Sequence, residues 1–183
     1  LSRTELTPSQ ATAAAEELLE ALEQREGAIV HNALADAIRA SVSKESVQAR
    51  LDQRVRINAG RIVGVSPGYN TTTVDAVVTT ADGDQALLMV LDDDGKLLAW
   101  KWADKIKPIE STALDFARDL AAGRWVIARS KLSLELQKDL SPQDLERKWT
   151  KLSRVSGGFR KVKDAVIAHQ GGEQQLVLVA VAF

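Results

Sequence analysis

Two side chains of the sequence are of the types that an isomerase uses to move a proton. Such an enzyme holds a carboxylate base in an apolar cavity, opposite a tyrosine or an acid that donates to an oxyanion. Asp75 lies between two apolar residues of a β-type segment, and Tyr69 is the single tyrosine of the chain. The alternative interpretation, which the sequence favours, puts Asp75 on the solvated face of an alternating strand and Tyr69 in a turn.

The sequence offers few side chains for other kinds of catalysis. The chain has no cysteine, which excludes a disulfide scaffold, a thiolate metal site and a cysteine nucleophile. Its two histidines, His31 and His169, are too few for a histidine-rich metal site, and both are interpreted as surface or loop residues. His31 and Asp36 are not spaced to share a helical face as a dehydratase pair. No nucleophile elbow, phosphate-binding loop or dinucleotide-binding glycine motif occurs.

The acidic run Asp92–Gly95 has the composition of a calcium-binding loop without its pattern. It lacks the spaced ligands and the distal glutamate that such a loop needs. An Asp-Gly hairpin turn explains the run fully. We therefore predict no metal and no cofactor.

A basic run spans residues 147–163, with seven Lys or Arg and no acid. Such a run suits an acidic protein, an anionic membrane surface or a nucleic acid. The simpler interpretation is a solvated helix face that also meets acidic parts of the chain, and nucleic acid is the least favoured partner. The candidate residues of this patch, of which three share one helical face and the fourth lies beside it, are Arg147, Lys148, Lys151 and Arg154.

The tryptophans are the other group with a choice of roles. The chain has four Trp but one Tyr and three Phe. Because side chains alternate along a strand, Trp100 and Trp102 share one of its faces. They form either a platform for a ligand or partner, or part of the core or of an interface between sheets. The sequence favours the core or the interface.

Composition and charge describe an ordinary globular protein with two unlike halves. Of 183 residues, 45% are apolar and 27% charged. Residues 1–106 carry 11 Lys/Arg against 16 Asp/Glu, and residues 107–183 carry 13 against 9, so the two parts have net charges of −5 and +4. No apolar run reaches the ~20 residues of a membrane span. Since the chain starts at Leu1, we expect a processed or excised piece. The sequence leaves the compartment open, and the alternatives are an extracytoplasmic protein or a larger membrane-associated one.

A shift of 98 residues superimposes the two parts of the chain over about 45 positions without a gap. Leu22 falls on Leu120 and Ile29 on Ile127, and the turn Ser43–Val47 falls on Ser141–Leu145. A fixed offset over several elements indicates duplicated units. We therefore predict two tandem repeats, residues 1–106 and 107–183.

Each repeat is predicted to start with three helices and to continue into antiparallel strands. Caps at Thr7, Ser43 and Ser141 and apolar periodicity predict the helices, and β-branched segments separated by Asp-Gly or Gly-Gly turns predict the strands. Compared with the first repeat, the second lacks its last hairpin. The helices are Ala11–Arg25, Ala28–Ser41 and one beginning after Ser43, then Ser111–Ala122, Trp125–Lys138 and Ser141–Arg154. The strands are Arg61–Val65, Thr71–Thr80, Gln85–Leu91, Lys96–Trp102, Phe159–His169 and Gln174–Phe183, with Ser66–Gly68 as a turn.

Several of these segments match the landmarks of a known group of domains. They are the helix start Leu140–Leu145 (LSPQDL), Trp149, the strand entry Gly157–Phe159 and the hairpin Asp92–Leu97 (DDDGKL). In these features the chain resembles the nuclear-transport-factor-2-like superfamily, and within it a bacterial domain family of unknown function. The resemblance covers residues 10–106 and 111–183. The first repeat departs from it at Leu51, where the family has Trp.

The resemblance implies a cone, in which three helices pack into the concavity of a bent antiparallel sheet and often leave a pocket. The expected fold class is therefore α+β, with two tandem cone-type repeats that pack as an internal pseudo-dimer and are able to form a homo-oligomer. Because this superfamily hosts isomerases, dehydratases, carriers and interaction domains, the fold does not settle the function. The leading hypothesis is a non-catalytic module that binds a protein or a small apolar ligand. The alternatives are an isomerase- or lyase-like enzyme that uses Asp75 with Tyr69, and a binder of anionic surfaces.

Overall fold

The computed structural model describes residues 5–103, 109–171 and 174–183, with the backbone alone at 103, 166–171 and 174–176. Contacts within the chain divide it into two compact units, Leu1–Asp104 and Lys105–Phe183. Each unit places helices before antiparallel strands, so the predicted α+β class is confirmed. None of the helices described is both long and apolar enough to cross a membrane.

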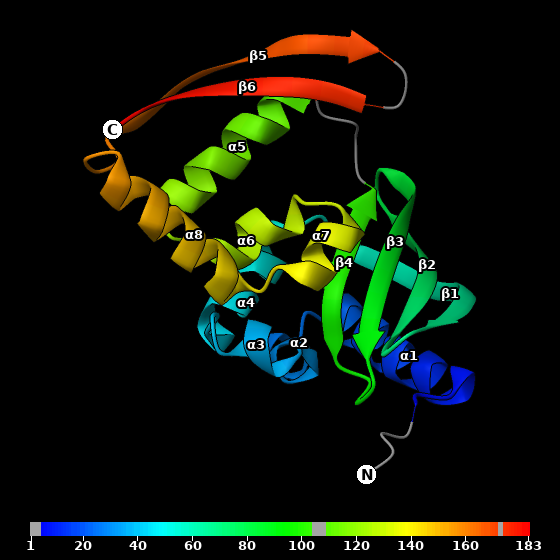
Figure 1. Cartoon of the computed structure of the whole chain (residues 1–183). Coiled ribbons are helices and arrows are strands. Elements are labelled where there is room, and N and C mark those ends of the chain that lie inside the picture. Colours follow the sequence, from blue (N-terminus) through cyan, green and yellow to red (C-terminus); the bar gives the residue numbers. More distant parts are fainter. Residues whose placement is uncertain (1–4, 104–108, 172–173) are drawn as a thin grey trace. The chain divides into compact units, whose positions relative to one another are not determined.

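The described residues of the first unit form four helices and four strands, which Figure 1 labels α1–α4 and β1–β4. The strands form one sheet in the order β1-β2-β3-β4, in which every neighbouring pair is antiparallel. The helices are α1 (Pro8–Gln24), α2 (Gly27–Ala33), α3 (Asp36–Arg39) and α4 (Lys44–Gln53). The strands are β1 (Ile57–Gly68), β2 (Thr71–Thr80), β3 (Gly83–Asp92) and β4 (Leu97–Ala103).

Helix α1 begins where its capping residues predict. The Thr7 hydroxyl accepts a hydrogen bond from the Gln10 N–H while the Gln10 side chain accepts from the Thr7 N–H, and Pro8 occupies the first helical position. The helix ends at Arg25, whose φ of 56° is left-handed. One face of the helix is buried against the sheet, and its buried residues are Ala11, Ala15, Leu18, Leu19, Ala21 and Leu22.

Strand β2 shows which face of the sheet forms the core. Its buried residues alternate with half-exposed ones, as the period of two requires. Val78 on this buried face is paired with Gly60 of β1, and a Cβ on Gly60 would lie 3.3 Å from the methyl groups of Leu19. The face that carries Val74, Ala76 and Val78 is therefore the one that α1 covers.

Two local predictions for the first unit are wrong. The helix expected over Ala28–Ser41 is broken at Leu34, because the Ala35 N–H donates to the Leu97 carbonyl oxygen of β4 at 2.9 Å rather than continuing the helix. The turn expected at Ser66–Gly68 belongs instead to β1, which pairs with β2 down to the Gly68–Thr71 pair. The turn lies at Tyr69 and Asn70, where Asn70 adopts a φ of 56°.

In the second unit, residues 109–171 and 174–183 form four helices followed by two strands. The helix expected over Trp125–Lys138 is also broken, at residues 131–133, where Ser133 starts a new helix by accepting from the Leu136 N–H. Gly157 and Gly158, with φ of 85° and 97°, connect the last helix to the sheet. The elements are α5 (Ile109–Ala121), α6 (Trp125–Ser130), α7 (Leu134–Asp139), α8 (Pro142–Val155), β5 (Lys161–Gly171) and β6 (Gln174–Ala182).

The helices of the two units begin at matching positions. Helices α2, α3 and α4 begin at Gly27, Asp36 and Lys44, and α6, α7 and α8 each begin 98 residues later. The sheets differ, since the second unit has two strands among its described residues where the first has four. The interpretation of the units as two cone-type repeats stays a prediction.

Candidate functional site

The tryptophans of β4 lie on the helix-covered face of the first sheet. Trp100 is paired with Met89 and Trp102 with Leu87, and both partners are fully buried on β3. These β3 residues are in turn paired with Val74 and Ala76 on the buried face of β2. Both indole rings are half-buried and meet edge to face, with 6.4 Å between their centroids.

Arg54 covers this tryptophan pair. Its Cζ lies 4.6 Å from the ring centroid of Trp102 and 5.8 Å from that of Trp100, which are cation–π distances. The backbone at Arg54 is held by Arg25, whose Nη2 donates to the Arg54 carbonyl at 2.8 Å. The Trp102 indole N–H donates to the Gln85 side chain. A guanidinium from the chain itself thus occupies the surface that a ligand would need, which supports a structural role for the pair.

The structure does not bring Asp75 and Tyr69 together. Asp75 is paired with Gly64 and Leu88 on the sheet face opposite Val74 and Ala76, and its carboxylate lies over Gly64. Tyr69 is 90% exposed at the tip of the β1–β2 hairpin. Four residues of β2 separate Asp75 from that tip, about 13 Å at the usual rise of a strand. Tyr69 thus lies in a turn, and Asp75 lies half-buried on the outer face of a strand.

His31 lies on α2 and joins it to the loop before α4. The side chain is half-buried, and its Nε2 is 2.9 Å from the Val42 carbonyl oxygen. The side chain of His169 lies outside the described residues. Among the side chains that are described, no group of three or more His, Asp or Glu is arranged to hold a metal ion.

The acidic run Asp92–Gly95 forms the β3–β4 hairpin turn that the sequence predicts. The Asp92 carboxylate accepts hydrogen bonds from the N–H groups of Asp94 and Lys96, at 3.0 and 2.9 Å. Gly95 has a φ of 73°, which favours glycine. The carboxylate of Asp92 is thus used to fold the turn.

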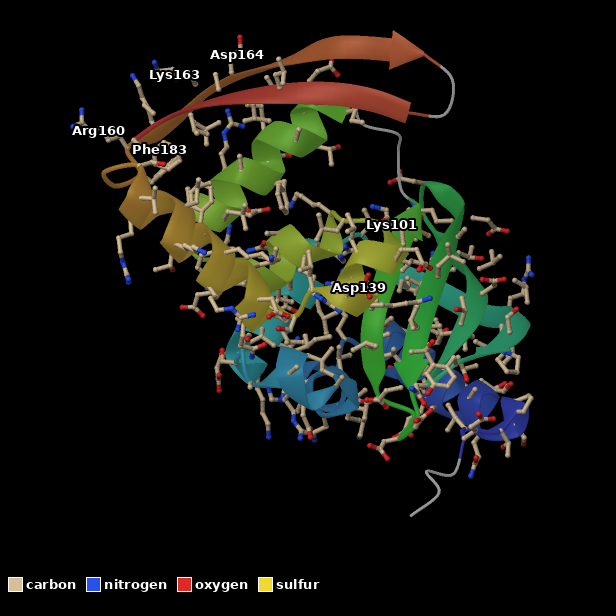
Figure 2. All side chains as sticks on the ribbon, in the orientation of Figure 1. Lys101, Asp139, Arg160, Lys163, Asp164 and Phe183 are labelled. Atoms are coloured by element: carbon tan, nitrogen blue, oxygen red, sulfur yellow. The ribbon has the colours of Figure 1, made fainter. Side chains whose placement is uncertain are left out.

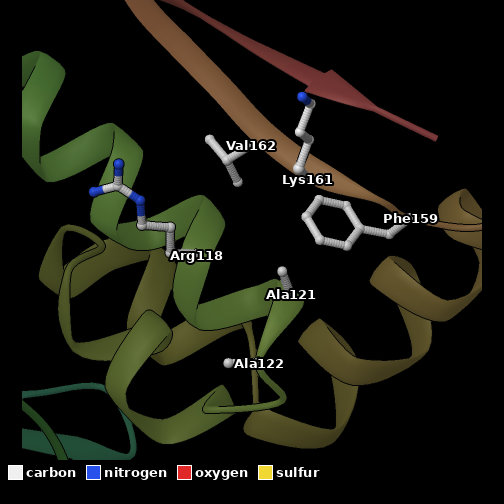
Figure 3. A pocket seen from close by; sticks show the side chains of 6 residues that line it. All are labelled: Arg118, Ala121, Ala122, Phe159, Lys161 and Val162. Carbon is white, nitrogen blue, oxygen red and sulfur yellow. The ribbon is translucent and has the colours of Figure 1, made fainter.

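A pocket of about 320 Å³ opens in the second unit, between the C-terminal half of α5 and the start of β5. Figure 3 shows Arg118 on one side, Phe159 and Lys161 on the other, and Val162 between them. None of the described residues that line the pocket is acidic. Two cations therefore border a mostly apolar hollow, whose lining is Arg118, Ala121, Ala122, Phe159, Lys161 and Val162.

Aromatic packing supports one wall of this pocket. The Phe159 ring centroid lies 5.3 Å from that of Trp149 on α8 and 6.3 Å from that of Phe183 after β6. Contacts at these distances contribute about 0.5–1.5 kcal/mol beyond the area they bury. The strand entry is thus fixed to α8 and to the end of β6, and Phe159 has a defined position at the pocket.

The cation opposite that wall belongs to α5. Asp115 is one turn earlier on the helix, and 3.6 Å separate its Oδ1 from Nη1 of Arg118. This distance exceeds that of a good charged hydrogen bond. Sequence reasoning missed Arg118, Ala121, Ala122 and Val162, because an ordinary amphipathic helix and strand carry the same residues. The signal that was available was the basic run, which contains Lys161.

The four cations predicted as a patch on α8 are all exposed. Arg147 is bonded to Asp144, the third residue of the helix. The pKa of Asp144 is lowered, first by its hydrogen bond from the Ser141 N–H and then by the Ser141 hydroxyl and the charge of Arg147. Beside the cations, Leu152 and Val155 are 49% and 80% exposed. The other members of the patch are Lys148, Lys151 and Arg154.

Buried charges hold the helices of the second unit together. The Asp119 carboxylate accepts from Arg124 Nε at 2.8 Å and also binds Lys131. Arg129 is buried, donates to the Leu140 carbonyl at 2.7 Å and to the Gln137 carbonyl, and has a pKa lowered to about 10 by burial. Since these groups are satisfied by helix ends and by each other, their role is structural.

No protein-family model and no curated protein sequence matches the chain. Among solved structures, the chain is similar to one described as the structure of an M. tuberculosis LEH-like epoxide hydrolase. That likeness has 18% sequence identity and a TM-score of 0.37, and it covers 51% of this chain and 81% of the other. A likeness of this size assigns neither a family nor an activity to the chain.

Proposed function

We propose that the protein is a non-catalytic module that binds a small amphipathic anion, an apolar molecule with one carboxylate or similar group, in the pocket of the second unit. The observation that carries the proposal is the pocket of about 320 Å³ with apolar walls and two cations at its border. Its volume is at the lower end of the ~300–1,000 Å³ of small-molecule sites.

The apolar part of the ligand is set by the lining. Ala121 and Ala122 have short side chains at the end of α5, so the space beside them stays free. Val162 and the Phe159 ring supply apolar surface on the strand side, and the ring is held by Trp149. A short alkyl or aryl group would bury its surface here at about 25 cal/mol per Å².

The anionic group is set by the charges. Arg118 belongs to α5 and Lys161 to β5, and the described lining residues include no acid. Asp115 lies 3.6 Å from Arg118, so a ligand would compete with it for that guanidinium. Hydrogen bonds between a cation and a carboxylate are stronger than neutral ones, and a guanidinium holds a carboxylate through two donors. The described lining residues also carry no carboxylate, hydroxyl or imidazole to act as a base or nucleophile, and we therefore propose binding without catalysis.

The proposal treats each unit as a cone-type repeat of the nuclear-transport-factor-2-like kind. The order of helices followed by an antiparallel sheet supports this, as do the starts of α2–α4 and α6–α8, which are 98 residues apart. In the first unit Arg54, Trp100 and Trp102 cover the sheet face on which a cone would hold its ligand. The second unit keeps a pocket, and we therefore assign the binding to it.

The test is isothermal titration calorimetry of the whole chain with decanoate, and with dodecyltrimethylammonium as a cationic amphiphile. Decanoate should bind and the cation should not. Arg118→Gln and Lys161→Gln should each weaken decanoate binding about tenfold, the equivalent of 1.4 kcal/mol. Ala121→Leu, which fills the pocket and leaves its charges unchanged, should weaken binding as well.

Lys148→Gln is the matched control, because it removes one exposed cation of the second unit that does not line the pocket. It should leave decanoate binding unchanged. Absence of binding, or equal losses in Lys148→Gln and Lys161→Gln, would overturn the pocket proposal. Equal losses would favour the anionic-surface alternative, in which the whole basic run acts through its charge.

A further inference from the structure

The last two turns of α8 carry exposed apolar side chains as well as exposed cations. Leu152 and Val155 are 49% and 80% exposed. Lys148 lies four positions before Leu152 and Lys151 four positions before Val155, so each aliphatic side chain shares a helix face with a lysine. Arg154, three positions after Lys151, extends the same face. We call these five exposed residues the α8 surface: Lys148, Lys151, Leu152, Arg154 and Val155.

The packed side of α8 fixes the direction in which this surface points. Leu145 on that side is buried. The Trp149 ring centroid lies 5.3 Å from that of Phe159 and 6.4 Å from that of Phe183, so the helix is held against the strand entry and the end of β6. The α8 surface is therefore turned away from the aromatic cluster of its own unit.

The positive charge around this surface is uninterrupted. The basic run contains seven Lys or Arg and no acid. Helix α8 has two acids before the run: Asp144 is bonded to Arg147, and Glu146 is not three or four positions from any cation of the α8 surface. Beyond the helix, Arg160 and Lys163 are exposed, and Figure 2 shows their side chains projecting from the chain near the start of β5. Cations thus surround two exposed aliphatic side chains.

We propose that the α8 surface docks on an anionic membrane surface, with its cations at the lipid head groups and Leu152 and Val155 in the interface. A helix face with Lys and Arg beside exposed aliphatic side chains is the pattern of an interfacial helix. Lys and Arg lay their stems along apolar surface while their charged ends reach the head groups. Because charges act over about 8 Å at physiological ionic strength, the local charge of α8 decides the attraction, although residues 1–106 carry a net charge of −5.

Two observations favour a membrane over other anionic partners. A single-stranded nucleic acid stacks its bases on free aromatic rings, whereas Trp149 and Phe159, the aromatic residues of the basic run, pack against each other. Charge recognition alone also gives no role to the exposed Leu152 and Val155, which a bilayer interface accommodates. The surface lies on the convex side of a helix, which suits a deformable layer of spread charge better than an inserted side chain of an acidic protein. The inference is independent of the decanoate pocket, since none of the five residues lines it.

The experiment measures sedimentation of the whole chain with lipid vesicles. Vesicles of phosphatidylcholine and phosphatidylserine in equal parts should bind the chain, vesicles of phosphatidylcholine alone should not, and added salt should weaken the binding. Lys151→Gln and Arg154→Gln should each weaken it about fivefold, the equivalent of about 1 kcal/mol for each cation at an anionic surface. Arg61→Gln is the matched control, because it removes an exposed cation of β1 and changes the net charge equally. It should bind as the wild type does.

A fluorescent label reports whether the aliphatic side chains enter the interface. The chain has no cysteine of its own, so Val155→Cys can be labelled at one position. A polarity-sensitive label there should emit at a shorter wavelength on the anionic vesicles. The same label on Val63→Cys, at an exposed valine of β1, should keep its emission.

Four outcomes would contradict the proposal. Absence of binding to the anionic vesicles overturns it outright. Equal losses in Arg61→Gln and Lys151→Gln, or an unchanged label at position 155 in the bound chain, would mean that net charge alone causes the binding. Tighter binding to a single-stranded oligonucleotide or to polyglutamate than to the vesicles would assign the α8 surface to a nucleic acid or to an acidic protein instead.

Discussion

The two units begin with the same succession of helices but are stabilised in different ways. In the first, most of the largest buried side chains lie on β2 and β3, among them Leu87 and Met89, and Leu18 of α1 joins them. In the second, the buried groups that the structure describes come from the helices and include the charged residues Asp119 and Arg129. A four-stranded sheet supplies one unit with an apolar core, while the other relies on bonds between helix ends and buried charges. The pocket described above lies in the unit whose described residues form the smaller sheet.

The largest expected effect is the loss of a core side chain from the first sheet. Leu87→Ala removes a side chain with no exposed surface and should lower the free energy of unfolding of the first unit by about 2–5 kcal/mol. Urea denaturation with hydrogen exchange of the β2 and β3 amides measures it. Leu152→Ala, at an exposed position, should cost less than about 0.5 kcal/mol. Equal costs for the two variants would show that the first sheet is not the core.

The second unit should respond to loss of a polar group instead. Arg129→Met keeps the length of the side chain but leaves the Gln137 and Leu140 carbonyls without their donor, which should cost about 1–3 kcal/mol. An opposing effect on stability exists, because burial disfavours the charged form of Arg129 and so lowers its pKa to about 10. Unfilled acceptors at a helix end should outweigh that cost. A more stable Arg129→Met variant, against an unchanged Arg154→Met control, would show that desolvation dominates.

Local signals predicted where α1, α4 and α8 start. The caps at Thr7, Ser43 and Ser141 and the Asp-Gly turn at Gly95 all lie where the sequence places them. They depend on residues within three or four positions of each other. The break between α2 and α3 depends on a bond from Ala35 to β4, 62 residues later in the chain. Apolar periodicity continues through that break, so no local pattern reveals it.

The site was less predictable than the fold for the same reason. Trp100 and Trp102 were placed on one strand face by alternation, but the guanidinium of Arg54 above them comes from a helix end 46 residues earlier. The pocket exists because small residues at the end of α5 face the first residues of β5. Alanines in a helix, such as Ala121, are ordinary in a sequence, and only the packing shows that they leave space. A basic run marked the neighbourhood of the site without identifying Arg118.

A smaller effect on stability is expected from the contact of Arg54 with the tryptophans of the first unit. Arg54→Gln and Trp102→Leu, singly and together, form a double-mutant cycle for the contact at 4.6 Å. The coupling energy should be about 0.5–1 kcal/mol, the usual value of a partly exposed cation–π pair. Thermal unfolding measures the three variants. A coupling of zero would mean that Arg54 leaves the rings in solution, and the tryptophan pair would then be an open platform comparable with the pocket of the second unit.

The smallest expected effect is on acid sensitivity, and it distinguishes α8 from α4, two helices that begin 98 residues apart. In α8 the third residue is Asp144, whose pKa is lowered below 3.8, mainly by the Ser141 N–H, whereas α4 has Ser46 there. Because the pKa is lower in the folded state, the stabilisation is complete above pH 3.8 and is lost as the pH falls through the folded-state pKa. Asp144→Asn should remove this part of the acid sensitivity of the second unit.

The reciprocal change at the other helix tests the same physical cause. Ser46→Asp gives α4 the capping box of α8 and should add acid sensitivity over the same pH range to the first unit. NMR titration measures the pKa of Asp144 in the wild type and of the introduced carboxyl in the Ser46→Asp variant. If the introduced carboxyl titrates at its ordinary value, Ser43 does not hold it as Ser141 holds Asp144. The low pKa of Asp144 would then be due to Arg147, which is bonded to it. Helix α4 has no cation at the matching position, because the residue 98 positions earlier is Ala49.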